Sequence, residues 1–132
     1  MPETTGPETK TNEPQPTAAG DTGGQCFRFD LQAELASVRQ DAAFQQGPGR
    51  LQKMLVKGPG LRIALTVMKS GNQWTEHKTP SRIFVQPISG SIRFAWPDGE
   101  ARLGAGQFLA LDPGIPHSVE ALEDAAFLLT LC

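Results

Sequence analysis

The chain has 132 residues, 39% of them hydrophobic, and a formal net charge of −2, which suits one domain with its own core. Its charges are scattered and form no basic stripe, so the composition argues against a nucleic-acid partner. Apolar runs are far shorter than the roughly 18 residues that indicate a membrane span, and the amino terminus shows no signal-peptide pattern. We therefore predict a soluble, cytoplasmic protein without a membrane partner.

The amino-terminal segment differs in composition from the rest of the chain. Residues 1–25 are mostly Thr, Pro, Gly and Glu, and they include no Val, Ile, Leu or aromatic residue. Such a segment cannot offset its ordering entropy by burial. We predict a disordered tail over 1–25 and one domain over 26–132. Cys26 and Cys132 have no CxxC partner, so reduced thiols are expected rather than a disulfide framework or a zinc site.

A helix is predicted at the start of this domain. Its apolar stripe has a 4-3-4 spacing: Leu31, Leu35, Val38 and Ala42. Asp30 can cap the helix, and Gly47-Pro48 end it. An amphipathic helix must pack on a partner, and the strand-like remainder of the chain would supply a sheet.

The rest of the chain has the pattern of short strands. Over 61–68 an aliphatic row at the odd positions alternates with a mixed row at the even positions, which begins with Arg62 and Ala64. A similar alternation covers 91–96. Such alternation is typical of strands with one face inward. Further short runs follow at 107–111, 117–122 and 125–131. Pro97-Asp98-Gly99 marks a turn. Many short strands separated by Gly and Pro turns predict an antiparallel sandwich or barrel.

Aromatic residues and one proline add detail to this prediction. The residues expected to fill the barrel core are Phe84, Phe94, Phe108 and Phe127. Pro87 falls inside a predicted strand and cannot donate to the hydrogen-bond ladder. We therefore expect an edge strand or a bulge at Pro87.

The only two histidines lie in two motifs bounded by glycines. The first, GNQWTEHKTPSRIFVQPISG, begins at Gly71 and contains His77. The second, GQFLALDPGIPH, begins at Gly106, contains Gly114 and ends at His117. Glycine suits the turns between strands, because it enters positive φ without steric cost.

Both motifs, in this order and with strands between them, resemble the signature of the cupin superfamily. The likeness covers about residues 50–132 and extends to small single-domain bacterial cupins with an RmlC-like jelly roll. It implies a mainly β fold, an antiparallel jelly-roll β-barrel with one N-terminal helix. It also implies a homodimer.

The resemblance implies metal-binding positions as well. His77 and His117 take the places of metal-binding histidines, whereas Thr79 and Ile83 stand where cupins have a second histidine and a glutamate. A catalytic zinc usually needs three protein ligands, and a mononuclear iron oxygenase site needs two histidines and a carboxylate. In a regular strand Glu76 points away from His77, unless a bulge turns it inward.

Other residues are weighed as ligands. Candidates for a third metal ligand from outside the motif positions are Gln86, Glu100 and Asp112, the last in place of the proline of the second motif. Arg82 and Arg93 are candidates for binding an anion, although solvated charges are the commoner explanation for such residues.

The favoured function is the binding of a small molecule in the barrel. The pocket residues would be Trp74, His77, Thr79, Ile83 and His117, a few polar groups in an apolar hollow. The alternative is a metal-dependent enzyme of the oxygenase or isomerase type, with one divalent ion (Fe, Mn, Ni or Zn) on His77 and His117. A third hypothesis is an interaction protein with an empty pocket. Whether the chain is an enzyme stays open at this point.

Overall fold

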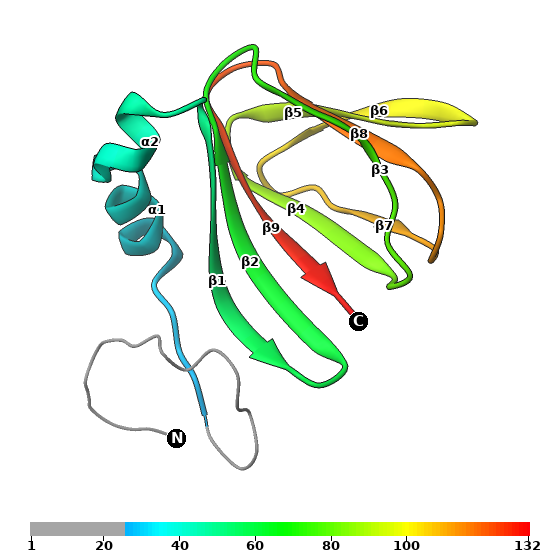
Figure 1. The fold of residues 1–132 in the computed structure, drawn as a ribbon, viewed down its shortest axis with the longest axis horizontal. Coiled ribbons are helices and arrows are strands. Elements are labelled where there is room, and N and C mark those ends of the chain that lie inside the picture. The colour runs from blue at the N-terminus through cyan, green and yellow to red at the C-terminus, as the bar shows by residue number, and fades with distance from the viewer. Residues whose placement is uncertain (1–25) are drawn as a thin grey trace.

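A computed structural model describes residues 26–132, which form two helices followed by nine strands (Figure 1). The prediction of a disordered tail over 1–25 lies outside the described residues. The helices are α1 (Leu31–Gln40) and α2 (Ala42–Gln46). The strands are β1 (Arg50–Gly58), β2 (Leu61–Met68), β3 (Gln73–His77), β4 (Ile83–Ser89), β5 (Ser91–Trp96), β6 (Gly99–Gly104), β7 (Leu109–Leu111), β8 (His117–Ala121) and β9 (Ala125–Leu131). No helix within 26–132 is long and apolar enough to cross a membrane.

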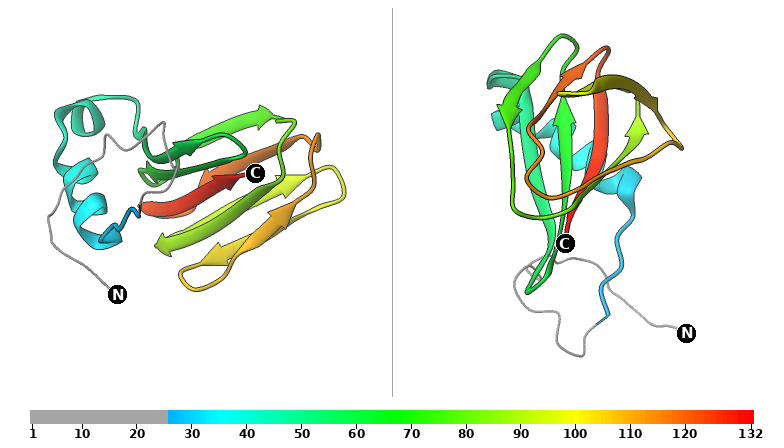
Figure 2. Two further views of the ribbon diagram at one scale, coloured as in Figure 1. Left: turned by 90° about the horizontal axis from the view of Figure 1, so that it is seen from below. Right: turned by 90° about the vertical axis from the view of Figure 1, so that its right-hand side faces the viewer.

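The strands form two sheets that face each other across a common core (Figures 1 and 2). The five-stranded sheet has the order β1-β2-β9-β4-β7, and the four-stranded sheet has the order β3-β8-β5-β6. All their pairings are antiparallel. The prediction of a mainly β, antiparallel jelly-roll barrel is confirmed.

The amino-terminal helical segment is broken at Asp41, where a single helix was predicted. The Asp41 N–H donates to the Val38 carbonyl (3.1 Å), and the Asp41 carboxylate accepts from the Ala43 N–H (2.8 Å). One residue therefore ends α1 and caps α2. Ala42, expected on the apolar stripe, is exposed, and Phe44 of α2 is buried instead.

Both helices cover the outer face of the five-stranded sheet (Figure 1). Leu35 and Val38 of α1 share one apolar cluster with Leu65 and Val67 of β2. The aliphatic row of β2 therefore faces the helices. The row facing the barrel interior is the mixed one: Arg62, Ala64, Thr66 and Met68.

The barrel core contains only part of the predicted aromatic set. Phe94 and Phe127 are at most 1% exposed, as predicted. The prediction for Phe108 is wrong, because this side chain is 64% exposed. Phe108 precedes β7, which starts at Leu109 and not at 107, and its ring lies 6.3 Å from that of Phe84. The prediction for Phe84 is also wrong, because this side chain is only half-buried and belongs to neither apolar cluster.

The irregular positions of the chain coincide with Pro87 and with the motif glycines. The register between β4 and β9 shifts between Pro87 and Ser89, so the predicted bulge is present, although β4 is not an edge strand of its sheet. Gly90 has φ +71°, and a Cβ there would lie 2.1 Å from the Asp124 carbonyl oxygen. Gly71, Gly106 and Gly114 also have positive φ.

Candidate functional site

The two histidines meet on neighbouring strands of the four-stranded sheet. In the antiparallel pairing of β3 with β8, His77 and His117 are direct cross-strand partners. Their ring centroids lie 4.3 Å apart, with the ring planes inclined at 64°. The two sequence motifs therefore contribute to a single site.

Hydrogen bonds to the main chain determine the tautomer of both imidazoles. Nδ1 of His77 lies 3.0 Å from the Thr75 carbonyl oxygen, and Nδ1 of His117 lies 2.9 Å from the Ile115 carbonyl oxygen. A carbonyl oxygen only accepts, so each Nδ1 carries the proton. In the neutral rings each Nε2 then has a lone pair available to a ligand.

A bulge in β3 brings an aromatic wall to the site. The register between β3 and β8 shifts between Trp74 and His77. The rings of Trp74 and His77 stack, with their centroids 4.8 Å apart. On the other side, the His117 ring stacks on Phe94 with centroids 5.4 Å apart. Glu76 stays exposed and does not line the cavity described below. Both imidazoles are thus held between rigid aromatic neighbours.

Burial changes the acid–base behaviour of the inner histidine. His117 is 4% exposed, and desolvation lowers its pKa below the usual 6.5. The hydrogen bond to Ile115 acts in the opposite direction, and positive charge on His77 lowers the pKa further. The interior of the site therefore favours a neutral His117.

The histidines line a cavity of about 220 Å³ inside the barrel. All five residues expected at the pocket contribute to its wall: Trp74, His77, Thr79, Ile83 and His117. Thr79 lies beyond the end of β3, not in a strand, and its carbonyl oxygen accepts from the Gly114 N–H (2.8 Å). This bond joins the first motif to the second.

The cavity also has walls that the motifs did not indicate. They are Gln52, Met54, Arg62, Ala64, Leu129 and Leu131. Gln52 donates from Nε2 to Thr66 Oγ1 (3.1 Å), so its amide oxygen can accept a further hydrogen bond. Arg62 and Ala64 belong to the mixed row of 61–68, which the alternating pattern did reveal. Alternation alone does not show which of the two rows faces the barrel.

The side chains present do not make a three-ligand metal site. Within residues 26–132 no group of three His, Cys, Asp or Glu side chains could hold an ion. Glu100 pairs with Arg93 (3.4 Å), and Asp112 pairs with Arg82 (3.1 Å). Gln86 is exposed, and none of the three expected third ligands lines the cavity. Two imidazoles are the metal-binding groups that this wall supplies.

Solved structures with a similar fold identify its class. A conserved protein of unknown function from Streptococcus pyogenes matches with 26% identity, covering 64% of this chain and 74% of that one, at a TM-score of 0.60. A cupin superfamily protein from Desulfitobacterium hafniense matches with 15% identity, covering 62% and 75% of the two chains, at 0.60. Salicylate 1,2-dioxygenase from Pseudoaminobacter salicylatoxidans matches with 12% identity, covering 78% of this chain but only 34% of the enzyme, at 0.69.

These likenesses confirm that the chain has the cupin fold, as its two motifs predicted. Comparisons with protein-family models and with curated proteins found no match. Cupin folds with similar structures occur both in proteins of unknown function and in metal-dependent enzymes. The fold alone therefore does not choose an activity.

Proposed function

We propose that this cupin binds a small organic molecule in the barrel cavity. The observation that carries the proposal is the histidine pair, in which both Nδ1 atoms donate to main-chain carbonyls and both Nε2 atoms are left for a ligand. The aromatic stacking fixes the rings before a ligand arrives, so little ordering entropy is lost on binding.

The size and lining of the cavity limit the ligand. About 220 Å³ is less than the roughly 300–1,000 Å³ of pockets for drug-sized molecules, so a smaller ligand is expected. Apolar walls from Ile83, Leu129 and Met54 would hold its body. The imidazoles would fix its orientation by accepting hydrogen bonds.

Side-chain NMR of the histidines tests the proposal directly. The chain has only two histidines, so both imidazole signals report on the cavity without assignment ambiguity. Addition of a panel of small organic fragments should shift these signals in a saturable way. Ala64→Leu fills the cavity and should abolish the shifts, because Ala64 is buried in its wall.

A matched control is available on β7. Ala110→Leu adds the same side chain at an exposed position and should leave fragment binding unchanged. The proposal fails if no fragment shifts the imidazole signals, or if both leucine variants reduce binding equally.

A metal-dependent enzyme of the oxygenase or isomerase type is the second candidate. The two available Nε2 atoms favour it, and a dioxygenase is among the proteins that share the fold. One divalent ion (Fe, Mn, Ni or Zn) would be held by His77 and His117 and would supply Lewis-acid chemistry. Elemental analysis of protein purified without an affinity tag should find a stoichiometric metal that His77→Ala and His117→Ala both remove. Metal-free protein that still binds fragments would eliminate this candidate.

For the assembly, we propose a homodimer that covers the outer face of the five-stranded sheet near β7. The support is Phe108, which is 64% exposed beside the half-buried Phe84. An exposed aromatic pair of this kind is typical of interface surfaces. Sedimentation of the full chain should show a dimer at micromolar concentration.

A further inference from the structure

The hairpin between β1 and β2 places two positive charges opposite each other. Lys57 and Arg62 are Cα partners in the antiparallel register. Like charges directly opposite on adjacent strands destabilise a sheet. In the part of the chain that the structure describes, no carboxylate forms an ion pair with either side chain. The position is therefore suited to a negative charge from outside the chain.

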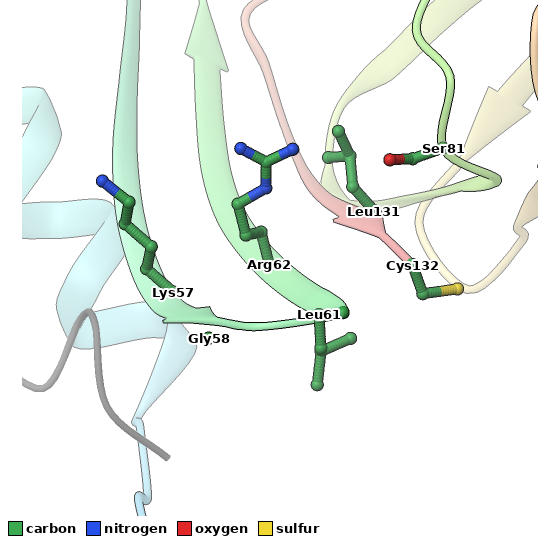
Figure 3. Close-up of a pocket in the computed structure, with 8 residues that line it drawn as sticks. Lys57, Gly58, Leu61, Arg62, Ser81, Leu131 and Cys132 are labelled. Carbon is green, nitrogen blue, oxygen red and sulfur yellow. The ribbon is translucent and has the colours of Figure 1, made fainter.

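A hollow of about 350 Å³ lies beside these two cations (Figure 3). Figure 3 shows the Arg62 guanidinium and the Ser81 hydroxyl on the two sides of the Leu131 side chain. No acidic side chain is among its lining residues. The main-chain oxygen of Cys132, at the edge of the hollow, accepts a hydrogen bond from the Arg82 N–H (2.9 Å). The side chains of Lys57, Arg62 and Ser81 thus offer this hollow hydrogen-bond donors and positive charge.

The hollow and the histidine cavity share part of their walls. Arg62 and Leu131 line both, so the hollow adjoins the cavity at the mouth of the barrel. The other arginines considered for anion binding differ from Arg62. Arg82 is paired with Asp112 (3.1 Å), and Arg93 is paired with Glu120 (2.7 Å). Arg62 is the arginine that lines the cavity, whereas the guanidinium of Arg50 lies over the ring of Trp74, 4.8 Å from its centroid.

We infer that the ligand of this cupin is a small organic carboxylate whose negative charge is bound by Arg62. The inference rests on the proposed binding function and names its ligand class. A guanidinium matches the planar fork of a carboxylate and can donate two parallel hydrogen bonds to it. Ser81 would donate a further bond, and Lys57 would add attraction through its charge. The apolar body of the acid would extend towards His77 and Ile83.

A pair of probes of nearly equal shape tests the ligand class. Benzoate carries the carboxylate, and benzamide is its neutral counterpart. Their affinities for the full chain are measured from the shifts of the two imidazole signals. Benzoate should bind roughly ten- to a hundredfold more tightly, which is the usual value of hydrogen bonds to a charged group. The preference should weaken with added salt.

Substitutions at three basic positions locate the anion site. Arg62→Gln should weaken benzoate binding far more than benzamide binding and so remove most of the preference for benzoate. Lys57→Gln should weaken benzoate binding by roughly threefold or less, since a charge without direct contact contributes little. Arg102→Gln, at an exposed position on β6, is the matched control and should leave the affinities for benzoate and benzamide unchanged. Without any ligand, Arg62→Gln should also raise the melting temperature, because it relieves the repulsion from Lys57.

The outcomes separate the inference from the proposed function. If neutral fragments bind but benzoate shows no advantage, the carboxylate inference is wrong and the binding function stands. The same conclusion follows if Arg62→Gln keeps the preference for benzoate. If no fragment of the panel, charged or neutral, shifts the imidazole signals, both proposals are overturned.

Discussion

The two halves of the barrel interior share the strands β2, β4, β8 and β9 but differ in their packing. In one half, Met68, Ile92 and Phe127 are fully buried in a continuous apolar cluster. In the other half, the side chains surround a cavity of about 220 Å³ and include two imidazoles and a guanidinium. The strand β9 contributes to both, with Phe127 in the packed half and Leu129 and Leu131 in the cavity wall.

This difference in packing assigns stability mainly to one half of the barrel interior and ligand binding mainly to the other. A densely packed half provides the apolar burial that offsets the entropy of folding. The half with the cavity forgoes that burial and keeps polar groups available for a ligand. Substitutions in the first half should therefore affect the free energy of unfolding, and substitutions in the second should affect ligand affinity.

The largest effect is expected for Phe127→Ala in the packed half. Loss of this buried ring should reduce the free energy of unfolding by about 3–5 kcal/mol, since it leaves a cavity among rigid neighbours. Leu131→Ala in the cavity wall should cost less than about 2 kcal/mol, because that side chain is only partly buried. Urea unfolding of both variants measures the difference. Equal losses would contradict the division of the interior into two halves.

Alanine substitutions at Gly90 and Gly114 compare two turns of the barrel. Gly90→Ala combines positive φ with a Cβ only 2.1 Å from the Asp124 oxygen, so we expect a loss above about 3 kcal/mol. Gly114→Ala at φ +80° has no atom within 4 Å of the new Cβ and should cost about 1–2 kcal/mol. Thermal unfolding of the two variants tests the order. A reversed order would mean that the loop before β8 is the more constrained turn.

The lowered pKa of His117 predicts how stability depends on pH. Between its folded pKa and the unfolded value of about 6.5, the unfolded chain binds more protons than the folded chain. The contribution to stability is therefore complete above about pH 6.5 and is lost as the pH falls towards the folded pKa. Urea unfolding from about pH 8 to about pH 5 should show a steeper loss for the natural chain than for His117→Gln. Parallel curves would show that burial does not depress this pKa.

The smallest effect on unfolding is expected outside the barrel, at Phe108. Phe108→Ser should change the stability of the single folded chain by less than about 0.5 kcal/mol, because the ring is 64% exposed. The proposed dimer should nevertheless weaken, as seen by a higher dissociation constant in sedimentation. A dimer of unchanged strength would show that this face is not the interface.

Alternation and turn residues were sufficient to predict the antiparallel barrel and the position of its motif glycines. The histidine motifs predicted the cupin fold, because both fall at the required intervals. Alternation could not distinguish the two rows of β2, since both faces of that strand are covered from Ala64 to Met68. Arg62 was missed for this reason.

Local irregularities account for the other differences. The break at Asp41 depends on one carboxylate that accepts from the Ala43 N–H, a choice that helical periodicity does not reveal. Phe108 was assigned to the core because hydrophobicity does not show where β7 begins. The bulge between Trp74 and His77 has no sequence signal, although it decides which side chains reach the cavity.

The bulge gives β3 one more residue between Trp74 and His77 than β8 has between their partners, Val119 and His117. Trp74 and His77 are three positions apart and yet stack on the same side, which regular alternation would not allow. Deleting one of the two residues between them would leave Trp74 and His77 two positions apart, where regular alternation also puts both side chains on one face. Trp74 would stay opposite Val119, and His77 would stay opposite His117. The pairing of the two histidines should therefore survive the loss of Glu76, because the bulge serves to accommodate one extra residue between Trp74 and His77.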